Sequence, residues 1–193
     1  MLVRRTVQAC LFAVILGLSV VAPTSSSSAS LGPVDPYASY APQTKCAPAA
    51  KIGTRTFAAW VVRRYGGAFG GISRPCNIGG TSEHKEGRAF DWTLDAAKAT
   101  DRRRAAAFLE RVFATDHWGN HASLARRMGI MYIIWNDRIY GAYDHFRPRA
   151  YLHSGCKRLA TCSKTLRHRD HMHISLSWRG ARGRTTWYVP RLG

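Results

Sequence analysis

Two segments of this chain alternate apolar and polar residues in the way that predicts half-buried β-strands. In residues 89–94 the apolar side chains fall on one face, and Asp91 falls on the other, less apolar face. In residues 171–178 the even positions are apolar, while His171 and His173 share the polar face. Each strand therefore presents one face to a core and offers polar groups on the other.

The rest of the pattern predicts helices and a hairpin. Helices are expected at 54–65, 101–115 and 120–128, the last with Asn120 as N-cap. A buried strand at 131–135 leads through an Asn136-Asp137 turn into residues 138–140, and 187–189 suggest a further strand. Glycine-rich residues 66–80 and basic residues 144–169 are expected to be irregular. The predicted fold class is α+β, with helices packed on one face of a small, mainly antiparallel sheet.

The start of the chain differs from the rest. Two arginines, an apolar run and a series of small residues read as a signal peptide over residues 1–30, cleaved near Ala29 or Ser30. A retained N-terminal anchor is the alternative. Residues 31–45 read as an extended lead-in rich in Pro and Ser, and the folded domain is expected at residues 46–193.

Cleavage would remove Cys10 and leave four cysteines, an even number that favours disulfides in an exported chain. Of the three possible pairings, Cys46–Cys76 with Cys156–Cys162 is favoured. The competing idea, a cysteine zinc site, lacks the two-residue spacing of zinc knuckles.

The formal net charge of +18 predicts attraction to polyanions, such as anionic cell-wall polymers. The same charge would also serve colloidal stability alone. A secreted basic nuclease is a third reading, but the basic residues are dispersed and no nuclease or RNA-binding motif appears, so no specific nucleic acid is expected. No segment after the signal peptide could span a membrane.

Three residues are candidate metal ligands: His84, Asp91 and His173. Asp91 and His173 lie in the two alternating segments, and His84 lies just before the first of them. Two imidazoles and a carboxylate suit a catalytic zinc ion, and three protein ligands leave one position for water. The sequence predicts one Zn²⁺ per chain. The alternatives without a metal ion are an ion pair between Asp91 and His84 and a surface position for His173.

A metal-activated water needs a base, and two residues compete for that role. Asp170 lies three residues before His173 and could act as the base or orient an imidazole. His171 projects from the same strand face as His173 and could move protons or stabilise an oxyanion. Glu86 is a minor rival. Histidines 145, 153 and 168 are expected to be surface or loop residues.

Ser82-x-His84-x-x-Gly87-x-Ala89-x-Asp91 resembles the first signature of the D-alanyl-D-alanine metallopeptidases. His171-x-His173 resembles the second signature of the wider LAS-type group, which includes lysostaphin-type and sonic-hedgehog-type domains. The likeness spans about 90 residues, and only about ten are signature positions.

This resemblance implies a fold like those peptidases, with His84, Asp91 and His173 as zinc ligands. It places Arg88 at the substrate or a developing oxyanion, and Ser82 in support of the turn. One position departs from the pattern, because members usually carry Glu where this chain has Asp170. The run from Ser82 to Ala89 also resembles small secreted actinobacterial proteins.

The combined expectation is a secreted zinc peptidase that hydrolyses peptidoglycan stem or cross-bridge peptides as a carboxypeptidase or an endopeptidase, with Asp170, His171 and Arg88 as catalytic residues. A zinc-bearing wall-binding module without catalysis is the alternative. Bound zinc without cleavage would favour that alternative.

Overall fold

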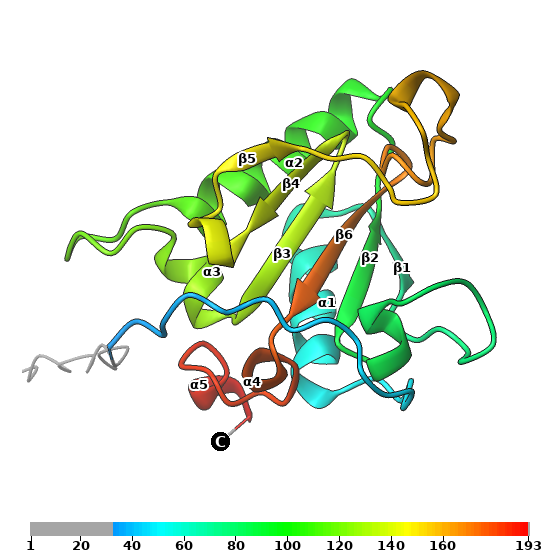
Figure 1. Ribbon diagram of the computed structural model, residues 1–193. Helices are drawn as coiled ribbons and strands as arrows, with labels where there is room; N and C mark the ends of the chain where they lie inside the picture. Colours follow the sequence, from blue (N-terminus) through cyan, green and yellow to red (C-terminus); the bar gives the residue numbers. More distant parts are fainter. Residues whose placement is uncertain (1–32, 193) are drawn as a thin grey trace, which may run out of the picture. The chain divides into compact units, whose positions relative to one another are not determined.

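The computed structural model describes residues 33–192, which are built around one six-stranded antiparallel sheet (Figure 1). The strand order is β1-β2-β6-β3-β4-β5. The strands are β1 Ala68–Gly71, β2 Ala89–Thr93, β3 Ile130–Trp135, β4 Arg138–Gly141, β5 Pro148–Ala150 and β6 His171–Leu176. The predicted α+β class and the four predicted strands that became β2, β3, β4 and β6 are confirmed.

The two long helices cover one face of this sheet (Figure 1). They are α1 Ile52–Tyr65 and α2 Ala99–Phe113, close to the predicted ranges. Phe57 of α1 and Phe108 of α2 pack edge-to-face at 6.3 Å, and Phe108 meets the Trp92 ring of β2 at 5.7 Å. Since Trp92 and its apolar neighbours on β2 point into this core, Asp91 points to the opposite, open face.

The remaining helices are short. These helices are α3 Ser123–Arg127, α4 Trp178–Ala181 and α5 Val189–Leu192, and the 3₁₀ turns are η1 Glu83–Glu86, η2 Ala142–Asp144 and η3 Leu159–Thr161. Two predictions about these regions are wrong. Ala122, not Asn120, is the N-cap of α3, because the Asn120 amide instead donates to Asp116. Residues 187–189 form a turn into α5 rather than a strand, and their aromatic pattern reflects burial of Trp187 and Tyr188 in the core.

Two strands were not predicted, and both are edge strands. β1 contains two glycines and β5 is three exposed residues long, so neither shows an apolar alternation. The Asn136-Asp137 turn between β3 and β4 is confirmed, with positive φ at both residues as a two-residue hairpin requires.

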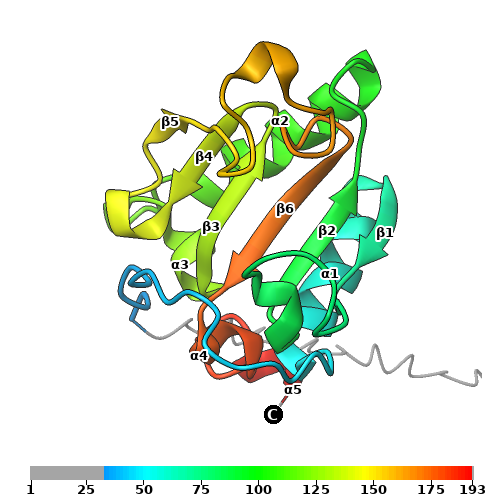
Figure 2. The same ribbon diagram turned by 45° about the vertical axis from the view of Figure 1, so that its right-hand side comes forward.

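Residues 33–50 are an extended strap that packs along one end of the sheet (Figure 2). Asp35 is buried and accepts hydrogen bonds from the backbone and hydroxyl of Thr186, at 2.9 and 2.6 Å. The Tyr37 hydroxyl lies 2.9 Å from Nδ1 of His121. The lead-in is therefore part of the packed structure although it has no regular secondary structure.

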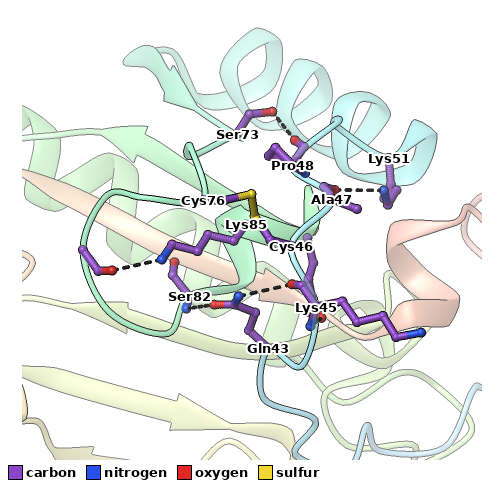
Figure 3. The surroundings of a disulfide bond; sticks show 12 residues. Gln43, Lys45, Cys46, Ala47, Pro48, Lys51, Ser73, Cys76, Ser82 and Lys85 are labelled. Atoms are coloured by element: carbon purple, nitrogen blue, oxygen red, sulfur yellow. Dashed lines mark hydrogen bonds between the residues drawn. A yellow bond between two sulfur atoms is a disulfide. The ribbon is translucent and has the colours of Figure 1, made fainter.

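Both expected disulfides are present. Cys46–Cys76 joins the strap to the loop before η1 (Figure 3), and Cys156–Cys162 closes a short loop between β5 and β6. The predicted signal peptide and Cys10 lie outside the described residues. Among residues 33–192 no helix has the length and apolar character needed to cross a membrane.

Candidate metal centre

Asp91 and His173 meet because the register of two neighbouring strands places them opposite each other. In the antiparallel β2–β6 pair, Asp91 is the direct partner of His173. Both side chains point to the open face of the sheet, and Oδ1 of Asp91 lies 3.0 Å from Nδ1 of His173. The predicted convergence of these two residues on one face is therefore present.

The third donor, His84, comes from the 3₁₀ turn η1, which precedes β2 in the chain. Ser82 caps this turn by accepting a hydrogen bond from the His84 backbone, so its predicted supporting role is confirmed. Gly87 ends the turn with φ of 64°, and a Cβ there would lie 2.1 Å from the Ala49 carbonyl oxygen. A glycine is required at this position both for the backbone conformation and for the close approach of the strap.

The donor atoms of His84, Asp91 and His173 all lie within 4.8 Å of one another, so this group could hold a metal ion. Nε2 of His84 lies 3.0 Å from Oδ1 of Asp91 and 3.2 Å from Nδ1 of His173. Two imidazole nitrogens and one carboxylate oxygen are a donor set that borderline divalent ions accept. The chemistry of the donors thus fits a metal ion with one or more open positions.

Both histidines are held in the orientation that ligation requires. Nδ1 of His84 lies 2.7 Å from the Ile72 carbonyl oxygen, so Nδ1 donates and Nε2 keeps its lone pair for the centre. Burial lowers the pKa of His173 despite the opposing influence of Asp91. Burial alone would raise the pKa of the Asp91 carboxyl, but the adjacent imidazoles of His173 and His84 hold it well below its usual range. An ionised carboxylate and a neutral imidazole are the forms that bind a metal ion.

The other nitrogen of His173 enters a chain of buried polar groups. Nε2 of His173 lies 2.9 Å from the hydroxyl of Ser175, and this hydroxyl donates to Oε2 of Glu83 at 3.4 Å. The Tyr132 hydroxyl donates to the same oxygen at 2.5 Å. Sequence reasoning had assigned no role to these three residues. The available signals were the position of Ser175 on the polar face of the strand and that of Glu83 directly before His84.

A pocket of about 170 Å³ reaches the donor cluster at His173, which lines it. It is lined by η1, β3, the loop before β6 and β6 itself, through residues that include Arg74, Glu83, Tyr132, His153, Thr165, His168, His171 and His173. A small substrate group can therefore approach the donor cluster from the open face of the sheet.

His171 and Asp170 form a hydrogen-bonded pair at this pocket. Nδ1 of His171 lies 2.7 Å from Oδ1 of Asp170, and the Thr165 hydroxyl donates to Oδ2 at 2.5 Å. Burial would raise the pKa of Asp170, but the hydrogen bonds from Thr165 and His171 lower it. Nε2 of His171 lies 3.8 Å from Oδ1 of Asp91, so its outer nitrogen faces the donors. Asp170 thus fixes the orientation of the His171 ring, with Nε2 of that ring directed toward Asp91.

His168 lies in the loop before β6, as expected, but its side chain is buried rather than at the surface. Its ring lies 4.7 Å from that of His171 and 5.7 Å from that of His173, and burial lowers its pKa to about 2. The ring is therefore neutral, and it packs beside the two histidines at the pocket wall. His153 lines the pocket, and His145 packs on Tyr37 at 4.6 Å, away from the three donors.

Arg88 lies within the protein rather than at the pocket surface, and its side chain is fully buried. Its Nε donates to Oε2 of Glu86 at 2.7 Å, and its remaining nitrogens donate to the carbonyl oxygens of Leu176 and Ala41. Glu86, also buried, accepts from the strap at Thr44 and Lys45. These contacts join the strap, η1 and β6, so Arg88 is a buried internal anchor and is not among the residues that line the pocket.

The chain is an α+β protein whose sheet carries a candidate metal centre on its open face. A family model described as VldE, C-terminal domain, matches residues 46–157, more than half of the chain, so the chain belongs to this family. The matched range contains His84 and Asp91 and ends before His171 and His173. Comparison with curated proteins gave no match, and neither did comparison with solved structures.

Proposed function

We propose that this protein is a secreted zinc-dependent peptidase that hydrolyses peptidoglycan peptides. One observation carries the proposal: the donors of His84, Asp91 and His173 converge beside an oriented His171–Asp170 pair, and His171 and His173 both line one pocket. A ligand set and an adjacent base are the two parts that hydrolysis by an activated water needs. The resemblance of both segments to the D-alanyl-D-alanine and lysostaphin-type peptidase signatures supports the same reading.

Zinc, when bound, would polarise the scissile carbonyl and lower the pKa of water to about 7. The protein's own residues supply the remaining functions. His171 takes the proton from the attacking water and returns it to the leaving amine. Asp170 holds Nδ1 of His171 so that Nε2 faces the substrate, and Thr165 fixes the Asp170 carboxylate.

Substrate class and location are inferred from the sequence, the disulfides and the charge. The predicted signal peptide, the two disulfides and the positive charge together support a role outside the cell, near an anionic wall. Peptide stems and cross-bridges are the peptide substrates in that wall, and the two cleavage types, carboxypeptidase and endopeptidase, share this site chemistry.

The test measures metal content and cleavage on the same preparation. The purified protein is expected to hold about one zinc per chain and to release D-alanine or shortened peptides from defined muropeptides, read by mass. His84→Ala should remove both zinc and cleavage, while the exposed His117→Ala serves as the matched control and should change neither. Folded protein without zinc would overturn the proposal, and zinc without cleavage would favour a binding module.

A further inference from the structure

We propose that Ser175 and Glu83 form a relay that positions His173 for metal binding and places a buried negative charge behind it. Neither residue contacts the pocket's reacting groups as a ligand, so both are positioning residues. The inference rests on the proposed metal centre and deepens it. It does not depend on which peptide, if any, is cleaved.

The relay has a single consistent direction of donation. If Nδ1 of His173 keeps its lone pair for a metal, Nε2 carries the hydrogen and donates to the Ser175 hydroxyl 2.9 Å away. The Ser175 hydroxyl then passes its own hydrogen to Oε2 of Glu83 at 3.4 Å. A carboxylate only accepts, so Glu83 ends the chain and determines its direction. The opposite tautomer of His173 would present an N–H to the donor cluster.

Tyr132 contacts both Glu83 and His173, the two ends of the relay. Its hydroxyl donates to Oε2 of Glu83 at 2.5 Å, which holds the carboxylate in place. Its ring also stacks on His173, with ring centroids 5.5 Å apart and planes 22° from parallel. The imidazole plane is thus fixed from its face and through its outer nitrogen.

Glu83 brings a charge as well as an acceptor. Its side chain is buried, and Oε1 lies 3.8 Å from the guanidinium of Arg88, which is itself paired with Glu86. A buried carboxylate linked through a hydroxyl to a ligating imidazole makes that imidazole a better donor to a cation. Because Glu83 directly precedes His84, one short turn supplies both a ligand and the end of the relay to the other histidine.

The test is a double-mutant cycle on zinc affinity with the full chain. The zinc Kd is measured by competition with a chromophoric chelator for the wild type, Ser175→Ala, Glu83→Gln and the double variant. The melting temperature of each metal-free protein is measured alongside. Cobalt is then substituted for zinc, and its visible absorption spectrum reports the geometry at the metal.

Ser175→Ala should weaken zinc binding by about 10- to 100-fold, in the range found for residues that support a ligand through a hydrogen bond. Glu83→Gln should weaken it less, because the amide oxygen still accepts a hydrogen bond. In the double variant the Glu83→Gln change should add nothing, because its route to His173 is already broken. The cobalt spectrum should change in both single variants.

Matched controls separate this relay from a loss of stability. Ser177→Ala removes a hydroxyl two residues further along, where it caps α4, and should lower stability without changing zinc affinity. Tyr151→Phe removes a hydroxyl from the same pocket and should leave zinc affinity unchanged.

The relay is overturned if both single variants bind zinc within about twofold of wild type, or if their effects add independently. A wild-type protein that binds no zinc would overturn the relay together with the proposed function. Zinc binding without peptide cleavage would overturn the proposed function and leave the relay standing.

Discussion

Asp91 and His173 are separated along the chain by the whole of the hairpin and the loop before β6, yet they are direct cross-strand partners with donor atoms 3.0 Å apart. The β2–β6 register alone brings them together. Because side chains alternate between faces, a slip of one residue would turn one of them into the core. The candidate metal centre is therefore a property of strand pairing.

Zinc should stabilise the folded protein through these donors. At free zinc about 1,000 times its Kd, the free energy of unfolding should rise by about 4 kcal/mol, because zinc binds only the folded state tightly. Asp91→Asn should abolish most of this gain, as seen by thermal unfolding with and without a chelator. An equal zinc-dependent gain in Asp91→Asn would contradict the assigned ligand set.

His171 should be needed for cleavage and not for metal binding. If it is the base, His171→Ala should lower the cleavage rate by about 10²- to 10⁴-fold at unchanged zinc content. Asp170→Asn should lower the rate less, because it disturbs the orientation of His171 and leaves the imidazole present. Cleavage rates on one muropeptide, with zinc measured on each variant, check both. Full activity of His171→Ala would return the role of base to Asp170.

Arg88 should matter for stability. Arg88→Met leaves the carboxylate of Glu86 buried without its partner, which should cost about 3–5 kcal/mol of unfolding free energy in urea titrations. Adding Glu86→Gln removes the unpaired buried charge and should recover part of the lost unfolding free energy. If Arg88→Met instead folds with wild-type stability and loses only cleavage, the role at the substrate holds.

The two disulfides should contribute unequally. On the chain-entropy account, a crosslink spanning 30 residues is worth about 3–4 kcal/mol and one spanning 6 about 2 kcal/mol. Replacing Cys46 and Cys76 by Ser should therefore lower stability more than replacing Cys156 and Cys162. The second pair should affect cleavage more, because its loop leads into pocket residues His153 and Thr165. Paired unfolding and activity measurements distinguish the two effects.

Much of the fold was predictable because its central strands bury one face. Alternation in residues 89–94 and 171–178 placed Asp91 and His173 on polar faces, and the signature around His84 supplied the third ligand. Which strands are neighbours could not be predicted, because the same alternation fits any neighbour in a sheet. The edge strands β1 and β5 were missed since neither has a buried face to leave a pattern.

The partners of the ligands were the least predictable part. Glu83 and Tyr132 meet because η1 packs against β2, within hydrogen-bonding reach of a side chain on β3. The hairpin turn holds the backbone of His168, with the Asn136 N–H donating to the His168 carbonyl at 2.8 Å. The resemblance placed Arg88 at the substrate or a developing oxyanion. It did not anticipate the strap, whose carbonyl at Ala41 draws the guanidinium inward.

The strand order has a consequence for how this protein is made. β6 lies in the middle of the sheet, between β2 and β3, although it is the last strand in the sequence. A chain that ends before residue 171 can form only two half-sheets, each with an open edge, and the 46–157 range of the family model falls within that limit. Pairings so distant in sequence form slowly. The three candidate donors therefore come together only after β6 has been made and has paired with β2, and in a chain exported before folding that step would take place outside the cell.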